Sequence, residues 1–397
     1  MDKLTAQNKI LVLDSNERSA LAVIRSLGAS PSLLISTADS INKSLGSCSK
    51  FSSSHYRHPS IIAEPKAFLE WLDELLTQTK FYAIFPCTEI SSQLLLMNPE
   101  VTSHCKIPFA SYETVMSLTN KGQLMKLANR VGVKTPSSAH FTSALDVNLE
   151  KISRYPIVIK PVLSQLWKKD HWQHTVVKIA HSKTELDTIL KQTRWLQDSP
   201  FMLQEFVEGY GAGIFAIYNR GKPIAFFQHQ RLREKPPQGG VSVLSKSAPL
   251  DPFLLKNAKT LLDKVKWHGV AMVEFRIATD GTPYLMEVNT RFWGSLQLAI
   301  DAGVDFPKLL YRITFGKKVS GDVQYNQKTK LRWLLGDFDS LYLVLKSSNY
   351  TLKEKINRIV QFLTPDFKNT RHQVARRGDW RPGIEELKQY FKSLSKR

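Results

Sequence analysis

Two long apolar runs that carry charged residues in their middle constrain the fold of this chain most. They span residues 269–278 (GVAMVEFRIA) and 283–292 (PYLMEVNTRF), and the turn pair Asp280-Gly281 lies between them. A pair of this kind typically joins two antiparallel strands. The sequence therefore predicts a hairpin whose polar side chains gather on one face, because alternate residues of a strand point the same way.

The polar residues of this hairpin form a candidate metal site. Glu274 lies on the first strand, and Glu287 and Asn289 project together from the second. Two carboxylates and an amide oxygen suit Mg²⁺ held together with phosphate oxygens. Arg291 follows two residues later and can bind a phosphoryl or acyl-phosphate oxygen. A solvated sheet face is the alternative, which the apolar neighbours disfavour because buried charges need partners.

Two lysines are candidates for phosphate contacts. Lys160 ends the apolar strand 155–160, where a buried ammonium needs an anionic partner. Lys121 begins a predicted helix, where a basic residue opposes the helix dipole. For Lys121, an ordinary exposed lysine explains the sequence equally well. The strand 201–207 then breaks into a loop that can present backbone groups to an adenine ring, although an ordinary strand end is the alternative.

The first hundred residues alternate short apolar strands with helical patterns, which indicates a parallel α/β unit. The expected strands are 9–13, 31–36 and 81–85. Thr88 and Glu89 follow the third strand, and ligands of such sheets sit at the carboxyl ends of strands. They are modest site candidates, and a helix cap with a first-turn acid is the favoured alternative.

A second region begins near Thr135, with antiparallel patterns, and the pattern changes again after Gly316. Residues 331–345 and 351–363 are expected to form helices. Leu352, Ile356, Ile359 and Leu363 share one face of the second helix. A helix packed on the protein is the favoured interpretation, and a basic amphipathic helix lying on a membrane is the other.

Composition limits the class of protein. The chain has 397 residues, 42% of them hydrophobic, which is enough for two or three cores. Its net charge is +20, and residues 317–397 hold 18 Lys and Arg against 8 Asp and Glu, which favours anionic partners. A basic but ordinary soluble protein is an equally good explanation. Three cysteines, no run long enough to span a membrane and an N-terminus unlike a secretory signal predict a cytoplasmic protein.

Taken in order, these motifs resemble the ATP-grasp superfamily, whose members include biotin carboxylase, carbamoyl phosphate synthetase and D-alanine ligase. The matching segments run from about residue 9 to residue 316: Asn120-Lys121, Tyr155–Lys160, Gln204–Gly209, Val273-Glu274-Phe275 and Met286–Arg291. The resemblance implies a parallel α/β preATP-grasp domain (1–113) followed by a two-lobed α+β ATP-grasp domain (114–316). Its lobes are expected at about 135–205 and 206–316, with a basic helical C-terminal extension at 317–397.

The resemblance also implies the roles of the site residues with ATP and Mg²⁺ or Mn²⁺ as cofactors. Lys121 and Lys160 would contact phosphates, and Glu205, Phe206 and Val207 would form the adenine hinge. Glu208 is the acid just past the hinge that can serve the ribose. The expected metal ligands are Glu274, Glu287 and Asn289, with Arg291 on the acyl phosphate.

The segment HQRLREKPPQGGVS (229–242) resembles the carboxylate–amine ligase-like branch of the superfamily. Arg231 and Arg233 are two residues apart and can form a bidentate anion clamp, which makes them further catalytic candidates. A basic hairpin followed by a surface loop is the alternative. The branch implies a ligase that activates a carboxylate as an acyl phosphate and joins it to an amine. The alternatives are a phosphotransferase and an ATP-regulated anion-binding or membrane-binding protein.

The loop after Lys160 departs from the family pattern, because it contains no glycine. Lys168 and Lys169 can supply phosphate contacts there instead. His171 and His174 are not expected to bind a metal, since no further ligands accompany them.

The expected partners are a small-molecule or glycan-linked carboxylate and an amine, with a homodimer possible. The basic tail can contact a membrane or polyanion. We expect no nucleic-acid partner, because the tail carries no recognisable nucleic-acid-binding motif.

Overall fold

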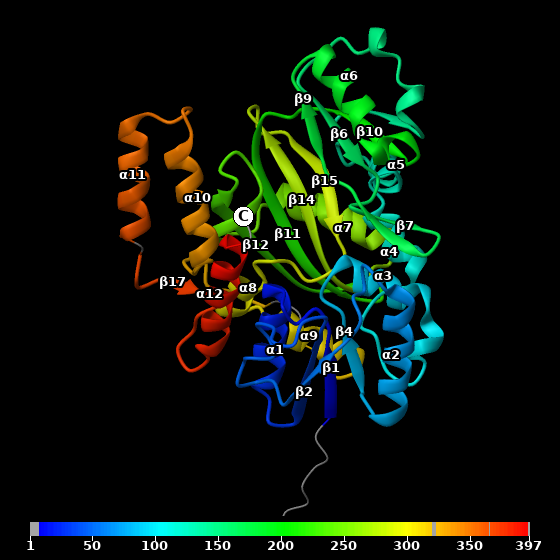
Figure 1. Cartoon of the computed structure of the whole chain (residues 1–397), viewed down its shortest axis with the longest axis vertical. Helices are drawn as coiled ribbons and strands as arrows, with labels where there is room; N and C mark the ends of the chain where they lie inside the picture. The colour runs from blue at the N-terminus through cyan, green and yellow to red at the C-terminus, as the bar shows by residue number, and fades with distance from the viewer. Residues whose placement is uncertain (1–7, 320–322, 365, 396–397) are drawn as a thin grey trace, which may run out of the picture.

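The computed structural model describes residues 8–319, 323–364 and 366–395. The first seven residues, which belong to the stretch examined for a secretory signal, lie outside this range. Three layers are stacked along the long axis, with the N-terminal sheet at one end and a small sheet at the other (Figure 1). A large sheet lies between them, and the last helices pack beside it (Figure 1).

The N-terminal layer is a parallel four-stranded sheet in the order β3-β2-β1-β4, as the alternating pattern predicts. Its strands are β1 (Asn8–Val12), β2 (Leu33–Asp39), β3 (Ser54–Arg57) and β4 (Ala83–Phe85). Its helices are α1 (Arg18–Gly28), α2 (Pro65–Gln78) and α3 (Glu89–Met97), followed by the 3₁₀ helix Pro99–Thr102. The short polar strand β3 was not predicted, because SHYR has no apolar run.

Helices α4 (Tyr112–Thr119) and α5 (Lys121–Arg130) lead into the small sheet, whose order is β5-β10-β6-β9. This sheet contains β5 (Ser138–Phe141), β6 (Ile157–Pro161), β9 (Lys178–Ala180) and β10 (Phe201–Glu205). Helix α6 (Lys183–Gln192) and the 3₁₀ helices Ala144–Asp146, Leu149–Lys151 and Arg194–Gln197 complete this end of the molecule.

The glycine-poor loop after Lys160 forms a separate hairpin of β7 (Gln165–Lys168) and β8 (His171–His174). Trp172 is buried against apolar residues of the N-terminal layer, among them Leu94 and Phe68, and Trp167 packs beside it. The two indole rings meet at 5.0 Å. The hairpin is therefore docked on a neighbouring layer rather than extended into solvent.

The large sheet is seven-stranded, in the order β15-β14-β11-β12-β13-β16-β17. Its first five strands in chain order are β11 (Gly209–Asn219), β12 (Lys222–Lys235), β13 (Val241–Ala248), β14 (Gly269–Ala278) and β15 (Pro283–Asn289). Helices α7 (Pro252–Lys264), α8 (Leu296–Ala302) and α9 (Phe306–Thr314) cover it. Phe215 and Ile217 of β11 face the core shared with the N-terminal layer, while Ile214 and Ala216 face the core under α7.

The C-terminal region is built into the large sheet. The short strands β16 (Lys330–Arg332) and β17 (Thr370–His372) extend it, and the helices are α10 (Leu334–Lys346), α11 (Leu352–Leu363) and α12 (Arg381–Leu394). The two predicted helices are present, although residue 331 lies in a strand. A buried ion pair between Arg25 and Asp379, with Nε–Oδ2 at 2.7 Å, ties this region to α1.

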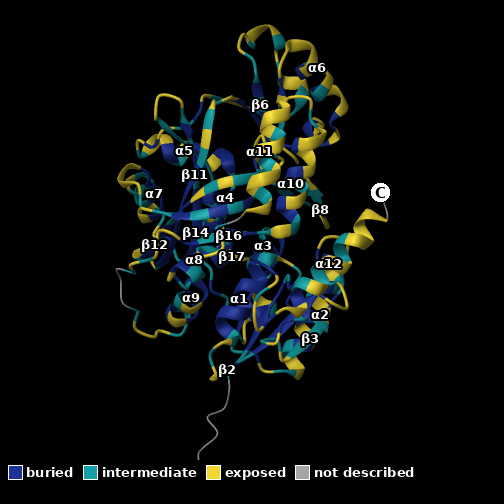
Figure 2. Cartoon of the chain, turned by 90° about the vertical axis from the view of Figure 1, so that its left-hand side faces the viewer, coloured by how far each residue is buried: buried dark blue, intermediate teal, exposed yellow. Residues whose placement is uncertain are grey.

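These layers confirm the predicted fold class, a parallel α/β unit followed by two antiparallel α+β units with helices at the C-terminal end. The domain boundaries remain a prediction. The sheets carry most of the buried residues, whereas α11 and α12 are largely exposed (Figure 2). In the part of the chain that the structure describes, no helix is long and apolar enough to cross a membrane.

Candidate active site

The predicted hairpin brings the polar residues of β14 and β15 together. Glu274 pairs directly with Glu287 in the strand register. Asn289 donates from its amide nitrogen to Glu274 Oε1 at 2.9 Å and to Glu287 Oε1 at 3.3 Å. Its amide oxygen is therefore the atom that can ligate a cation. The three predicted metal ligands form one cluster on one face of the hairpin.

The two predicted phosphate-binding lysines reach this cluster from other elements. Lys121 is the first residue of α5, behind the N-cap Asn120, and its Nζ lies 3.3 Å from Glu287 Oε2. Lys160 lies near the end of β6 and donates from Nζ to the carbonyl of Met286 at 2.9 Å. Both lysines are buried, so their charges are directed at the cluster rather than at solvent.

Burial and neighbouring charges shift the acid–base properties of the cluster in opposite directions. Burial raises the pKa of Glu274, although the Arg231 guanidinium opposes this effect. Burial would also raise the pKa of Glu287, but Lys121 and Lys160 outweigh it and hold that pKa below its usual value. Burial lowers the pKa of Lys160 to about 8. Glu287 is therefore the more acidic carboxyl group of the pair.

Arg231 and Arg233 do not form the expected clamp. The register of β12 against β13 shifts between these residues, and such an irregularity breaks the two-residue alternation. Arg231 faces the cluster, with Nη2 at 2.7 Å from Glu274 Oε2 and Nη1 at 3.1 Å from Glu234 Oε1.

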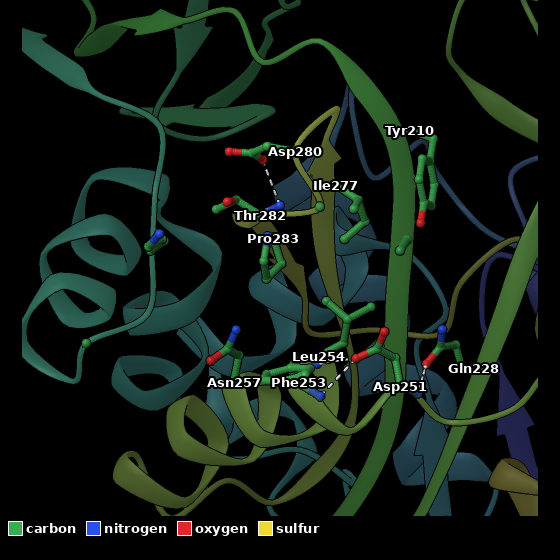
Figure 3. A pocket seen from close by; sticks show the side chains of 14 residues that line it. Tyr210, Gln228, Asp251, Phe253, Leu254, Asn257, Ile277, Asp280, Thr282 and Pro283 are labelled. Atoms are coloured by element: carbon green, nitrogen blue, oxygen red, sulfur yellow. Dashed lines mark hydrogen bonds between the residues drawn. The ribbon is translucent and has the colours of Figure 1, made fainter.

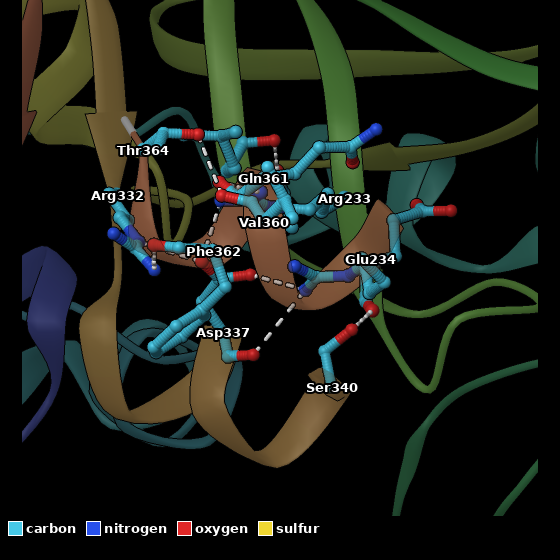
Figure 4. A network of polar contacts seen from close by, with 12 residues as sticks. Arg233, Glu234, Arg332, Asp337, Ser340, Val360, Gln361, Phe362 and Thr364 are labelled. Carbon is cyan, nitrogen blue, oxygen red and sulfur yellow. Dashed lines mark hydrogen bonds and ion pairs between the residues drawn. The ribbon is translucent and has the colours of Figure 1, made fainter. Parts of the chain in front are cut away.

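Arg233 instead joins a buried network around Asp337 of α10 (Figure 4). Its Nη2 lies 2.6 Å from Asp337 Oδ2, which also accepts from Arg332 Nε at 2.7 Å. Arg358 binds the other oxygen of the same carboxylate at 2.6 Å. Arg233 therefore connects the large sheet to the C-terminal helices and lies outside the cluster.

A cavity of about 280 Å³ opens beside the metal-ligand cluster. It is lined by Glu274, Glu287, Asn289, Arg231 and Arg291, and by His229, Gly240, Val241, Ser242, Met272, Trp293, Gly294 and Ser295. Sequence reasoning did not single out His229, Trp293 or Ser295 individually. His229 lies in the 229–242 segment, while an apolar core explains Trp293 from sequence alone.

A smaller space on the other side of Glu287 contains Glu89, Lys121 and Arg291. Thr88 is the N-cap of α3, as its favoured interpretation predicts, because its hydroxyl accepts from the amide of Ser91. Glu89 begins that helix and faces the site, and burial raises its pKa. The carboxyl end of β4 therefore contributes an acid to the edge of the cluster.

The predicted adenine hinge links the two antiparallel sheets. Glu205 ends β10, and Phe206, Val207 and Glu208 connect it to β11. The Val207 carbonyl accepts from Arg276 Nε at 3.2 Å. Farther along β11, Gly213 pairs with Glu274. Four residues of strand separate Gly209 from Gly213, so the hinge ends roughly 13 Å from the metal-ligand cluster.

The β7–β8 hairpin directs its basic residues away from the cluster. Lys168 binds Asp198, with Nζ at 2.9 Å from the carbonyl and 3.4 Å from the carboxylate. His174 Nδ1 lies 2.7 Å from the Gln165 amide. Within residues 8–319, 323–364 and 366–395, no three or more His, Cys, Asp or Glu side chains gather as a metal site, so His171 and His174 do not form one.

Another cavity, of about 490 Å³, lies on the opposite side of the large sheet (Figure 3). Its walls include Tyr210 and Ile277 of the sheet and Phe253, Leu254 and Asn257 of α7. None of the predicted site residues lines it, and its charged groups are few. The chemistry is therefore concentrated in the smaller cavity.

Comparisons with known proteins agree with this architecture. Residues 197–336 match the model of a family described as ATP-grasp in the biosynthetic pathway with Ter operon. D-alanine–D-alanine ligase A of Bacillus cereus is 24% identical over 220 residues, covering 51% of this chain and 70% of that ligase.

Solved structures share the fold at low sequence identity. L-amino acid ligase from Bacillus licheniformis superimposes with a TM-score of 0.61 at 15% identity, covering 78% of this chain and 74% of that chain. The biotin carboxylase domain dimer of Hydrogenobacter thermophilus 2-oxoglutarate carboxylase, in complex with MgADP, ADP and bicarbonate, gives 0.60 at 16% identity. It covers 81% of this chain and 73% of that chain.

The fold, the family match and the sequence relative define the class: this chain is an ATP-grasp protein, as its ordered motifs predict. Within that class its relatives include D-alanine and L-amino acid ligases, and the prediction of an ATP-grasp enzyme of the ligase kind is confirmed at this level.

Proposed function

We propose that the chain binds ATP with Mg²⁺ or Mn²⁺ and uses it to join a carboxylate to an amine. One observation carries this proposal. Two carboxylates, an amide oxygen and two buried lysines from four separate elements converge beside one cavity. Such a convergence of opposite charges suits a nucleotide phosphate with its metal better than it suits a structural core.

The roles follow from position. Lys121 and Lys160 are the phosphate contacts. Glu274, Glu287 and Asn289 are the metal ligands, because their oxygen atoms meet on one face and suit Mg²⁺. When bound, the metal offsets negative charge on the phosphate oxygens. The hinge of Glu205, Phe206, Val207 and Glu208 holds adenosine at the far end of β11.

The reaction then takes place in the 280 Å³ cavity. A carboxylate oxygen of the substrate attacks the γ-phosphorus, and the bond from that phosphorus to the bridging oxygen breaks to release ADP. The product is an acyl phosphate, whose oxygens Arg291 and Arg231 stabilise. An amine nitrogen attacks the carbonyl carbon, phosphate leaves with the bonding pair, and the nitrogen loses a proton to form the amide.

Replacing Glu287 tests the proposal. Glu287→Gln removes a metal ligand and the charge that faces Lys121, so substrate-dependent release of ADP should fall by about 10²-fold or more. Glu354→Gln, on the exposed face of α11, serves as the matched control and should retain activity. Full activity in Glu287→Gln would contradict the proposed site.

Product analysis separates the ligase from a phosphotransferase. Mass spectrometry of the reaction should show a product that has lost one water relative to acid plus amine. A stable phosphorylated product without an amide would instead establish the phosphotransferase alternative. A glycan-linked substrate and a homodimer remain predictions.

A second candidate function, contact with an anionic membrane surface, is favoured by α11. None of its residues is buried. Leu352, Ile356 and Leu363 are 75%, 51% and 66% exposed on one face. Lys353 and Lys355 flank that face by helical spacing, which is the pattern of a helix that lies on a lipid surface. A second copy would bring these positive charges together, so a lipid surface suits them better.

Vesicle sedimentation tests this contact. The protein should bind vesicles that contain an anionic lipid and not purely zwitterionic vesicles. Replacing Ile356 and Leu363 by Ser should abolish binding, whereas Phe253→Ser, which changes an equally exposed apolar residue of α7, should not. Equal binding by both variants, or concentration-dependent dimerisation lost in the α11 variant, would reject the lipid surface.

A further inference from the structure

Two buried polar groups in the 280 Å³ cavity have no partner within the described chain. His229 and Trp293 are each 3% exposed, and both line the cavity. His229 Nε2 and Trp293 Nε1 make no hydrogen bond with any described residue. The other ring nitrogen of His229 lies 3.3 Å from Ser295 Oγ. An unpaired buried polar group costs about 1–3 kcal/mol, so such groups need an explanation.

Trp267 provides a contrast within the same chain. Its indole nitrogen is also buried and unpaired, but it lies in the core under α7 and does not line this cavity. Trp293 lies where a ligand can reach it, next to the metal-ligand cluster. The unpaired groups of the cavity are therefore candidates for reading a substrate.

The polar groups that surround this space are mainly hydrogen-bond donors. An indole N–H and a guanidinium donate and cannot accept, which applies to Trp293, Arg231 and Arg291. The two carboxylates of the cavity already face cations, Glu274 with Arg231 and Glu287 with Lys121. Burial and Arg231 lower the pKa of His229 to about 3, so its imidazole is neutral and can also donate.

We propose that this cavity binds the acyl substrate and selects a small carboxylic acid with a second hydrogen-bond acceptor close to the carboxylate. A hydroxyl group or a second carboxylate meets this requirement. An ammonium group does not, because it offers three donors and no acceptor to a wall of donors. The inference rests on the proposed function and names the substrate class of that same site.

Matched acids test this selection. Lactate, alanine and propionate share one carbon skeleton and differ only in a hydroxyl, an ammonium or a hydrogen, and malate, aspartate and succinate repeat the comparison at a larger size. Acid-dependent ADP release should be about 10- to 100-fold more efficient in kcat/KM for the hydroxy acid than for the other members of at least one series. Equal or greater efficiency with the amino acid would overturn the proposal.

Binding of MgATP, measured first by calorimetry, separates the two possible failures. If MgATP binds and none of the six acids stimulates ADP release, the substrate class is wrong and the nucleotide site stands. If MgATP does not bind, the proposed function fails as well.

A pair of tryptophan variants tests the reading residue. Trp293→Phe and Trp267→Phe each keep a buried aromatic ring and remove one indole N–H. The preference for hydroxyl over hydrogen should shrink about tenfold in Trp293→Phe and stay unchanged in Trp267→Phe. An unchanged preference in both would show that water, not substrate, occupies Trp293 Nε1. Should Trp293→Phe fail to fold, the acid series still decides the proposal.

Discussion

Lys121 Nζ lies 3.3 Å from the Glu287 carboxylate, which joins the first turn of α5 to the last strand of the metal-binding hairpin. Both groups are predicted to serve the nucleotide, one through a phosphate and the other through a metal. In the structure they neutralise each other. A bound metal phosphate can replace this contact with two of its own, so the site is held ready without an uncompensated buried charge.

Lys160 predicts a pH dependence of nucleotide binding. Burial lowers its pKa to about 8, and the ammonium is the form that binds phosphate. As the pH rises from 7 to 9, the free protein loses this proton, so MgADP affinity should fall by up to about tenfold per unit above pH 8. Calorimetric titrations at several pH values measure the effect. In Lys160→Met, affinity should be low throughout, with no step near pH 8.

The same shift affects stability with the opposite sign. Because folding lowers the pKa of Lys160 from 10.5, the unfolded chain binds more protons between about pH 8 and 10.5. The contribution of Lys160 to the free energy of unfolding should therefore rise across this window. Urea titrations at pH 8 and 10 should show a smaller rise, or a larger fall, in Lys160→Met than in the wild type.

Arg231 and Arg233 should separate activity from stability. Arg231→Gln removes a cation from the site and should reduce kcat by about 10²–10³-fold with little loss of stability. Arg233→Gln should leave kcat within a few fold but lower the free energy of unfolding by about 1–3 kcal/mol, since it weakens the Asp337 network. Steady-state kinetics and urea denaturation of both variants check this; the reverse assignment would contradict the structure.

The ion pair between Arg25 and Asp379 should show that the C-terminal region stabilises the whole chain. Both side chains are buried, and Ser49 Oγ and the Lys50 amide also donate to Asp379. Asp379→Asn should cost about 3–5 kcal/mol, measured by urea denaturation. The exposed pair of Lys191 and Asp187 is the control, and Asp187→Asn should cost less than about 1 kcal/mol.

Gly209 should be essential at the hinge. Its φ is +145°, and a β-carbon there would come within 1.8 Å of the Ile277 carbonyl oxygen. Gly209→Ala should therefore displace the hinge and weaken ATP binding at least tenfold. Gly132→Ala, at φ +75° with open space around it, imposes strain of about 1 kcal/mol without a collision and should leave ATP affinity unchanged.

The sequence predicts best where a local pattern alone decides the geometry. The pairing of Glu274 with Glu287 follows from two alternating runs and one turn pair, and the helix start at Lys121 follows from its N-cap. Arg231 and Arg233 were wrongly expected to form a common clamp, since an irregular register depends on neighbouring strands rather than on spacing. Strands β16 and β17, three residues each, are too short for any period to appear.

Other features depend on contacts between distant segments. The roles of His229 and Trp293 depend on which strand and loop enclose them, so an apolar core explains them equally well from the sequence. The docking of the β7–β8 hairpin likewise depends on the N-terminal layer, which no local pattern records.

That hairpin gives the protein an optical signal of its own. If it lifts from the N-terminal layer to admit or release a nucleotide, Trp167 and Trp172 must pass from an apolar contact into water. Two of the eight tryptophans would then change their fluorescence together. Each opening and closing could be timed in a stopped-flow instrument without a dye.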